Sequence, residues 1–321
     1  MTPTANRIQH DRSIEGMVYG FLGVLGFSFT LPATRLAVAS FDPVIVGLGR
    51  ALIAACFAAP LLLLTRQKRP LASQWRSIAI VIAGVIIGFP MLTAWAMRLV
   101  PAAHGAVVLG LLPLATAIAG VLRAHEHPSI GFWLASATGS FAVVAFALAS
   151  GGGSIHSADI ALLGAVVLAA LGYAEGARIA RELGGWQVIC WALVAAAPIL
   201  LVPVGLAIRA HGLEARSSSW FGLAYVSMIS MFLAFFAWYH GLAIGGVARV
   251  SQLQLLQPFL TLAFSALFLG ERFGLGAMAC AGLVALSIFV SRRSRVTLRH
   301  PGTPHPPVLR TESPAPRTGS S

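Results

Sequence analysis

Five polar side chains recur at helical spacing within one apolar segment near the end of the chain. Ser251, Gln254, Gln257, Thr261 and Ser265 follow one another at steps of three or four residues, which places them on one face of an α-helix. Because hydrocarbon offers amide and hydroxyl groups no partner, this face is expected to contact other helices or a wet cavity. The side chains could hydrogen-bond a polar ligand, or they could join neighbouring helices.

A proline directly follows Gln257 and is expected to alter the backbone of the same segment. Pro258 has no N–H group, so it cannot donate to the carbonyl of Gln254 four residues earlier. The sequence therefore predicts one free carbonyl acceptor beside the two amide side chains.

Two charged residues fall inside other apolar segments. Glu175 could carry a proton, since buried carboxyl groups hold protons more readily; alternatively, it could pair with Arg178 three residues later. Arg50 could attract an anionic group of a ligand; alternatively, its side chain could extend towards the membrane surface or cap carbonyls of a neighbouring helix. The two residues are expected at different depths, so direct pairing between them is not predicted.

Aromatic and acidic residues elsewhere offer further candidates. Trp95 and Tyr173 lie deep enough in their segments to stack on a ligand, whereas Trp238 and Tyr239 are expected at a membrane interface. Two histidines flank Glu126 without a third ligand in the sequence, so no metal site is predicted. Glu126 and its later counterpart Glu271 are expected to cap the helices that begin just after them.

The elements that must position these residues are membrane helices. Of the 321 residues, 57% are hydrophobic and 10% are charged, with a mean hydropathy of +0.83; a soluble domain carries about 25% charged residues. Apolar runs long enough to cross a bilayer recur along the chain. They predict an all-α polytopic membrane protein with ten spans, near 17–35, 43–64, 77–98, 103–122, 130–149, 159–180, 186–207, 219–240, 247–269 and 274–291.

The formal net charge of +12 comes from basic residues between the apolar runs. If the N-terminus lies inside the cell, the inner segments hold most of the Lys and Arg residues, which favours cytoplasmic N- and C-termini in the plasma (inner) membrane. The basic balance therefore indicates membrane topology rather than nucleic-acid binding. No Walker A motif occurs, and no cofactor is predicted.

The chain also contains an internal repeat. A shift of 145 residues aligns the fourth and fifth predicted spans of one half with those of the other, without gaps. The identities include Pro113 with Pro258, Thr116 with Thr261, and Glu126 with Glu271. Because each half has an odd number of spans, the second half enters the membrane from the opposite side. The predicted units are a cytoplasmic segment 1–16, two inverted five-helix repeats at 17–149 and 159–291, and a disordered basic, Pro-rich cytoplasmic tail at 292–321.

The glutamines are not part of this repeat. The positions aligned with Ser251, Gln254 and Gln257 are Ala106, Leu109 and Leu112. The polar face therefore belongs to one half only, which favours ligand recognition over a packing role shared by both halves.

The paired P…E units, each followed by a Gly-rich final helix, resemble the drug/metabolite transporter superfamily in its EamA-type branch. The stretches FDPVIVGLGR at 41–50 and GYAEGARIAR at 172–181 add to the resemblance, which covers about residues 17–291. It implies export of small metabolites, amino acids or drugs, often coupled to an ion gradient of protons or sodium. It also implies a cavity between the halves, with the fifth and tenth helices at the periphery.

The sequence thus favours a secondary transporter that works by alternating access on a small molecule in the lipid bilayer. An intramembrane enzyme would need a catalytic cluster at membrane depth, whereas Glu175 is the one acid clearly inside a predicted span. A channel, which with a membrane scaffold is the third alternative, would need a charged or carbonyl ring around a symmetric pore, and nothing in the sequence repeats in that way. The oligomeric state is not specified. The candidate residues for substrate binding are Gln254, Gln257, Thr261, Ser251, Trp95, Tyr173 and Arg50, and the candidate for ion coupling is Glu175.

Overall fold

The computed structural model describes residues 3–100, 102–124, 126–149, 157–269 and 296–298. The predicted tenth span, the residue Glu271 and most of the predicted tail lie outside the described residues. Within the predicted tail, Val296–Leu298 forms a short strand, β2.

In the described ranges, the regular secondary structure is helical apart from one pair of three-residue strands. The elements of the N-terminal half are α1 (Pro3–Ser28), α2 (Thr30–Val38), α3 (Pro43–Gly47), α4 (Gly49–Leu64), η1 (Ala72–Gln74), α5 (Trp75–Val81), η2 (Ile82–Gly88), α6 (Phe89–Leu99), α7 (Ala102–Leu109), α8 (Leu112–Ala124), β1 (Glu126–Pro128) and α9 (Ile130–Ala149). Strand β1 pairs antiparallel with β2.

The C-terminal half repeats this succession of helices with fewer interruptions. Its elements are α10 (Ser157–Leu183), α11 (Gly185–His211), α12 (Ser217–Tyr225), η3 (Val226–Leu233), α13 (Ala234–Gly245), α14 (Val247–Ser251), η4 (Gln252–Leu256) and α15 (Gln257–Leu269). Segments η2 and η3 are π-helical, whereas η1 and η4 are 3₁₀-helical.

Six helical stretches in the described residues are long and apolar enough to cross a membrane. They are Ile14–Val38, Pro43–Leu64, Ala72–Leu99, Ser157–Leu183, Gly185–His211 and Ser217–Gly245. The predicted fourth and ninth spans are instead broken helices, α7 with α8 and α14 with α15. The all-helical polytopic architecture is therefore confirmed, and the total of ten spans stays a prediction.

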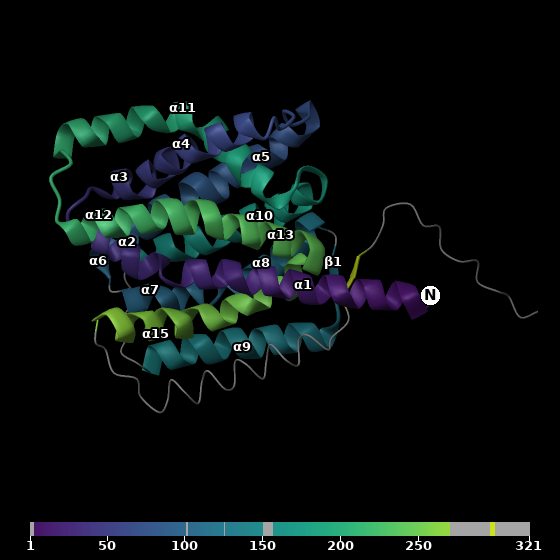
Figure 1. The fold of residues 1–321 in the computed structure, drawn as a ribbon. Coiled ribbons are helices and arrows are strands. Elements are labelled where there is room, and N and C mark those ends of the chain that lie inside the picture. Colours follow the sequence, from purple (N-terminus) through teal and green to yellow (C-terminus); the bar gives the residue numbers. More distant parts are fainter. Residues whose placement is uncertain (1–2, 101, 125, 150–156, 270–295, 299–321) are drawn as a thin grey trace, which may run out of the picture.

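The two halves interleave rather than stand apart. Helix α1 packs on α13, and α10 packs on α6 and η2; α4 packs on α11, and α8 on α14. Each of these contacts joins the two halves. The first two are equivalent, because in each the first helix of one half packs on the third predicted span of the other. Helices α9 and α11 lie along opposite edges of the bundle, while α1, α8, α10 and α13 run between them (Figure 1).

Backbone irregularities recur at nearly the same spacing as the sequence repeat. The π-helical segments begin at Ile82 and Val226, and the broken helices are interrupted at Gly110–Leu111 and at η4. In membranes, such irregular backbone is tolerated where protein or a cavity can satisfy it. The interruptions are therefore a feature of both halves of the fold.

Glycines let α1 approach α13 closely. A Cβ atom at Gly16 would lie 2.5 Å from the Cα of Gly245, and one at Gly23 would lie 2.9 Å from the Cβ of Trp238. Small residues at such positions bring backbones together where no hydrophobic effect drives helix association. The contact therefore places the backbone of α1, from the first half, directly against that of α13, from the second half.

Candidate functional site

A cavity lies between the two halves, where the helices are interrupted. Its polar lining comes from Thr30, Arg50, Tyr173, Ser230 and Gln257, and its remaining wall is aliphatic and aromatic, with contributions from α1, α2, η2, α6, α7, α8, η3 and α13. Among the side chains that the structure describes, none from α9 or α11 lines the cavity. The position agrees with the cavity that the family resemblance implies.

The cavity is small in this conformation. Its empty volume is about 410 Å³ when the part open to solvent is included, near the lower end of the roughly 300–1,000 Å³ typical of small-molecule pockets. A bulky ligand therefore enters only if the helices around the cavity move.

The interruption between α1 and α2 is stabilised by side chains from the other half. Pro32 has no N–H group to donate to the carbonyl of Ser28, and Thr261 Oγ1 donates to that carbonyl at 2.6 Å. Gln257 Nε2 donates to the neighbouring carbonyl of Phe27 at 3.5 Å. The predicted polar face of α15 thus joins the halves and lines the cavity at the same time.

A hydroxyl pair also crosses the cavity. Thr30 Oγ1 and Ser230 Oγ lie 2.9 Å apart, and either oxygen can be the donor. We did not predict these two residues from the sequence. A signal was present, since Thr30 precedes Pro32 by two residues within an apolar run, where a helix is expected to break.

The predicted free carbonyl of Gln254 is wrong. Residues 252–256 form a 3₁₀-helix, and the N–H of Gln257 donates to the carbonyl of Gln254. A 3₁₀ segment pairs each carbonyl with the N–H three residues later, so Pro258 does not leave this acceptor unpaired.

The same tighter winding divides the predicted polar face. Gln257 and Thr261 line a second hollow that adjoins Leu31, whereas Ser251 donates to the carbonyl of Ala248 at 3.0 Å. The side chain of Gln254 is buried, and neither of its amide atoms has a hydrogen-bond partner among the described residues. The structure therefore brings Gln257 to the cavity and Thr261 to the second hollow, whereas Ser251 and Gln254 line neither.

Arg50 is one of the largest fully buried side chains, with 1% of its surface exposed. It is the second residue of α4 and lines the cavity together with Tyr173. In the part of the chain that the structure describes, no carboxylate forms an ion pair with it, and its buried Nε has no hydrogen-bond partner. The side chain does not extend to the surface, which was one of the structural alternatives.

Of the two aromatic residues predicted to contact a ligand, one lines the cavity and the other does not. Tyr173 is buried in the cavity wall, and its ring centroid lies 6.4 Å from that of Phe27 in a stacked arrangement. Trp95 is 40% exposed and does not line the cavity. Trp238 and Tyr239, expected at an interface, are fully buried, because α13 is enclosed by α1 and α10.

Glu175 lies outside the cavity and joins the two halves. Its carboxylate oxygens lie 2.7 Å from Arg123 Nε and 2.7 Å from Arg178 Nη2. Arg178 also donates to Ser77 Oγ at 2.5 Å. The ion pair with Arg178 was one of the two alternatives, and the pair with Arg123 from α8 adds a contact between the halves.

Glu126 caps a helix, but not the one that follows it in the chain. Its two carboxylate oxygens accept hydrogen bonds of 2.7 Å from the backbone N–H groups of Val247 and Ala248, at the start of α14. Gly246 precedes them with φ of +87°, a backbone conformation that suits glycine. The fold places the acid of one half on a helix of the other, so local sequence could not reveal the partner.

Burial raises the pKa of the Glu126 carboxyl. The N–H groups of Ala248 and Val247 and the charges of Arg181 and Arg249 lower the pKa, but they do not offset burial. The folded chain is therefore expected to take up a proton at Glu126 at a higher pH than the unfolded chain. Stability from this group increases as the pH falls through the window between the raised pKa and the ordinary value of 4.5.

Comparison with known proteins gives three findings. The profile of the EamA-like transporter family matches residues 14–148 and 156–293. The uncharacterized transporter YdeK of Bacillus subtilis (strain 168) is 46% identical over 284 residues, covering 88% of this chain and 99% of YdeK. One crystal structure with 17% sequence identity has a TM-score of 0.72, over 87% of this chain and 98% of that chain; at that identity it shows a shared fold alone.

Proposed function

The chain belongs to the EamA-like transporter family, and on that premise we propose that it is a secondary active transporter. The family and the relative are named as transporters, not as enzymes, and the helical stretches are those of a multi-pass membrane protein. The proposed activity is export of a small metabolite, amino acid or drug across the plasma (inner) membrane by alternating access.

The observation that carries the proposal is the cavity at the interruptions of both halves. Transporters built from inverted repeats bind their substrate near the bilayer midplane, between discontinuous helices. Here the broken segments of α1–α2, α7–α8 and α14–α15 and both π-helical segments meet at one cavity. The two family matches along the chain support a division into two related halves.

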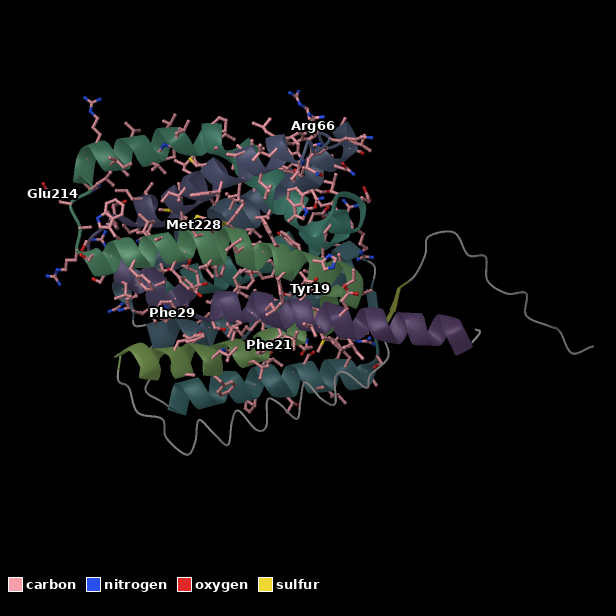
Figure 2. All side chains as sticks on the ribbon, in the orientation of Figure 1. Tyr19, Phe21, Phe29, Arg66, Glu214 and Met228 are labelled. Carbon is pink, nitrogen blue, oxygen red and sulfur yellow. The ribbon has the colours of Figure 1, made fainter. Side chains whose placement is uncertain are left out.

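One group of polar contacts between the halves lies at the end of the bundle where β1 lies, which we call the β1 end; other contacts, such as Ser219 with Leu36 and Ser40, cross elsewhere. The group at the β1 end comprises Glu126 with Val247 and Ala248, Glu175 with Arg123, Ser77 with Arg178, Gln74 with Glu182, and Gln67 with Gln187. Arg66 lies at this end and Glu214 at the opposite one (Figure 2). By the distribution of basic residues we propose that the β1 end is cytoplasmic, as are both termini, and that these contacts break when the cavity opens inward.

We further propose that a proton or sodium gradient drives the transport. Among the described residues, two carboxyl groups are buried, those of Glu126 and Glu175. A proton that binds Glu175 has to compete with two guanidinium groups in direct contact, whereas Glu126 accepts its hydrogen bonds from backbone N–H donors, with the charges of Arg181 and Arg249 acting from further away. We therefore place Glu126 ahead of Glu175 as the site of proton coupling.

Replacing Gln257 by leucine is expected to abolish transport and to leave folded protein in the membrane. The substitution removes the amide from the cavity and replaces it with an apolar side chain of similar size. The measurement is uptake into proteoliposomes of the compounds that the wild-type protein carries, found by screening metabolites, amino acids and drugs. Gln252→Leu is the matched control, because Gln252 is buried in the same segment but outside the cavity.

Normal uptake by Gln257→Leu would contradict the cavity assignment. A continuous ionic conductance of the wild-type protein in planar bilayers would favour a channel instead. Gradient-driven accumulation that saturates with substrate concentration is the result expected of a transporter.

A further inference from the structure

We propose that Arg50 binds the anionic group of the substrate, and that the substrate is a small organic monoanion with an apolar body. This inference rests on the proposed transport function and specifies what the cavity selects. It starts from a buried charge that has no counter-charge among the residues that the structure describes.

Arg50 is held in a position that is unfavourable without a ligand. Its side chain is 1% exposed, lines the cavity, and has a buried Nε with no hydrogen-bond partner among the described residues. A buried guanidinium costs much more than a neutral side chain unless an anion and hydrogen-bond acceptors compensate for lost water. A planar guanidinium matches the two oxygens of a carboxylate in a bidentate pair.

The acids near other parts of the bundle are engaged elsewhere. Asp42 lies 4.0 Å from Arg98 and 3.9 Å from His211 at the end opposite β1, while Glu175 pairs with Arg123 and Arg178. Glu126 is bonded to the start of α14. None of these carboxylates lines the cavity.

The cavity therefore has one fixed positive charge and no negative charge in its described lining. An ammonium group, whether of a lipophilic cation or of a zwitterionic amino acid, finds no carboxylate there and is repelled by Arg50. A monoanion supplies the missing partner without adding an unpaired charge. Charge thus decides between substrates that share the same apolar body.

The rest of the lining describes the body of the substrate. Phe27, Phe89 and Phe235 provide aromatic surface, and Thr30 with Ser230 provides a pair of hydroxyls. Such a wall suits an apolar or aromatic group that carries at most a few hydrogen-bonding atoms. A small inorganic anion would leave most of this surface unused.

The test uses three probes with one phenyl-terminated chain and different charges: 3-phenylpropionate, phenylalanine and 3-phenylpropylamine. Further matched pairs of carboxylate and amine with other apolar bodies extend the series, and chloride serves as the inorganic anion. Binding is measured as thermal stabilisation of the purified full-length protein, and transport as charge displacement on solid-supported membranes. The carboxylate of at least one matched set is expected to stabilise the wild-type protein more than its amine or amino-acid counterpart does.

Arg50→Gln is expected to weaken carboxylate binding about 10- to 100-fold, the range for losing a charged hydrogen-bond partner. Arg50→Lys should recover part of the affinity, because it restores the charge without the bidentate geometry. Without ligand, Arg50→Gln should melt at the wild-type temperature or above, since a buried unpaired charge has been removed. Arg209→Gln makes the same charge change at the end of α11, outside the cavity, and should bind as the wild type does.

The outcomes separate this inference from the transport function. If amines or zwitterions bind and are carried while every carboxylate is ignored, transport stands and the anion assignment is overturned. Binding of carboxylates that is unaffected by Arg50→Gln, equal stabilisation by chloride, or no preference in any matched set also overturns it. If carboxylates bind through Arg50 but no gradient moves them across a membrane, the anion site stands and the transport function fails.

Discussion

Replacing Glu126 by alanine is expected to lower the melting temperature of the purified protein by roughly 5–10 °C, which corresponds to about 3 kcal/mol. The substitution removes two charge-assisted hydrogen bonds and leaves the backbone N–H groups of Val247 and Ala248 buried. Because those bonds join β1 of one half to α14 of the other, the loss falls on the contact between the halves. The measurement is thermal unfolding in detergent or nanodiscs.

A glutamine at position 126 keeps the shape of the side chain but removes its charge, so the two contributions can be measured apart. Glu126→Gln keeps one acceptor oxygen, so its melting temperature should lie between those of the wild type and Glu126→Ala. It cannot take up a proton at this site, and the dependence of transport on a pH gradient should disappear. Glu15→Ala, on an exposed acid of α1, is the matched control. Unchanged melting of Glu126→Ala would show that the two hydrogen bonds do not stabilise the fold.

Replacing Glu175 by alanine is the second change with a large expected effect. It leaves the guanidinium groups of Arg123 and Arg178 facing each other without a counter-charge between α8 and α10. Both arginine side chains are about two-fifths exposed, so solvent screens part of the repulsion. We expect a loss of about 2 kcal/mol, less than for a fully buried pair.

A double-mutant cycle measures this interaction directly. In an Arg178→Gln background, Glu175→Ala should cost less than in the wild type, because one of the two ion pairs is already gone. Glu214→Ala, on an exposed acid at the opposite end, should have little effect in either background. Proton dependence of transport should persist in Glu175→Gln; its loss there, with retention in Glu126→Gln, would move the coupling role to Glu175.

The helices and their grouping into halves were largely predictable because they depend on local composition. An apolar run of about 20 residues has to form a helix in hydrocarbon, whatever surrounds it. The repeat of Pro113 in Pro258 likewise indicated two related halves, and the family matches support it. The contacts of Gln257 and Thr261 with another helix followed from the cost of exposing polar groups to lipid.

Partners across the bundle were not predictable in this way. The carboxylate of Glu126 binds Val247 and Ala248, which are more than a hundred residues away in the chain. The prediction that Glu126 caps the following helix was wrong. The buried N–H groups of Val247 and Ala248 need an acceptor, and the fold brings Glu126 close to them. Gln254 failed for a backbone reason, since a 3₁₀ turn in place of an α-turn rotated the side chain away from the cavity.

The sequence by itself determined that this chain is a polytopic membrane protein with two related halves, and it marked Arg50, Gln257 and Glu175 as polar residues in apolar surroundings. Those properties follow from composition and spacing, which act locally. Only the tertiary structure decided which of these residues meet. Arg50 faces a cavity without a counter-charge in its described lining, while Glu175 has two. A buried charge has its effect through its neighbours, and neighbours in a helical bundle are set by packing between distant segments.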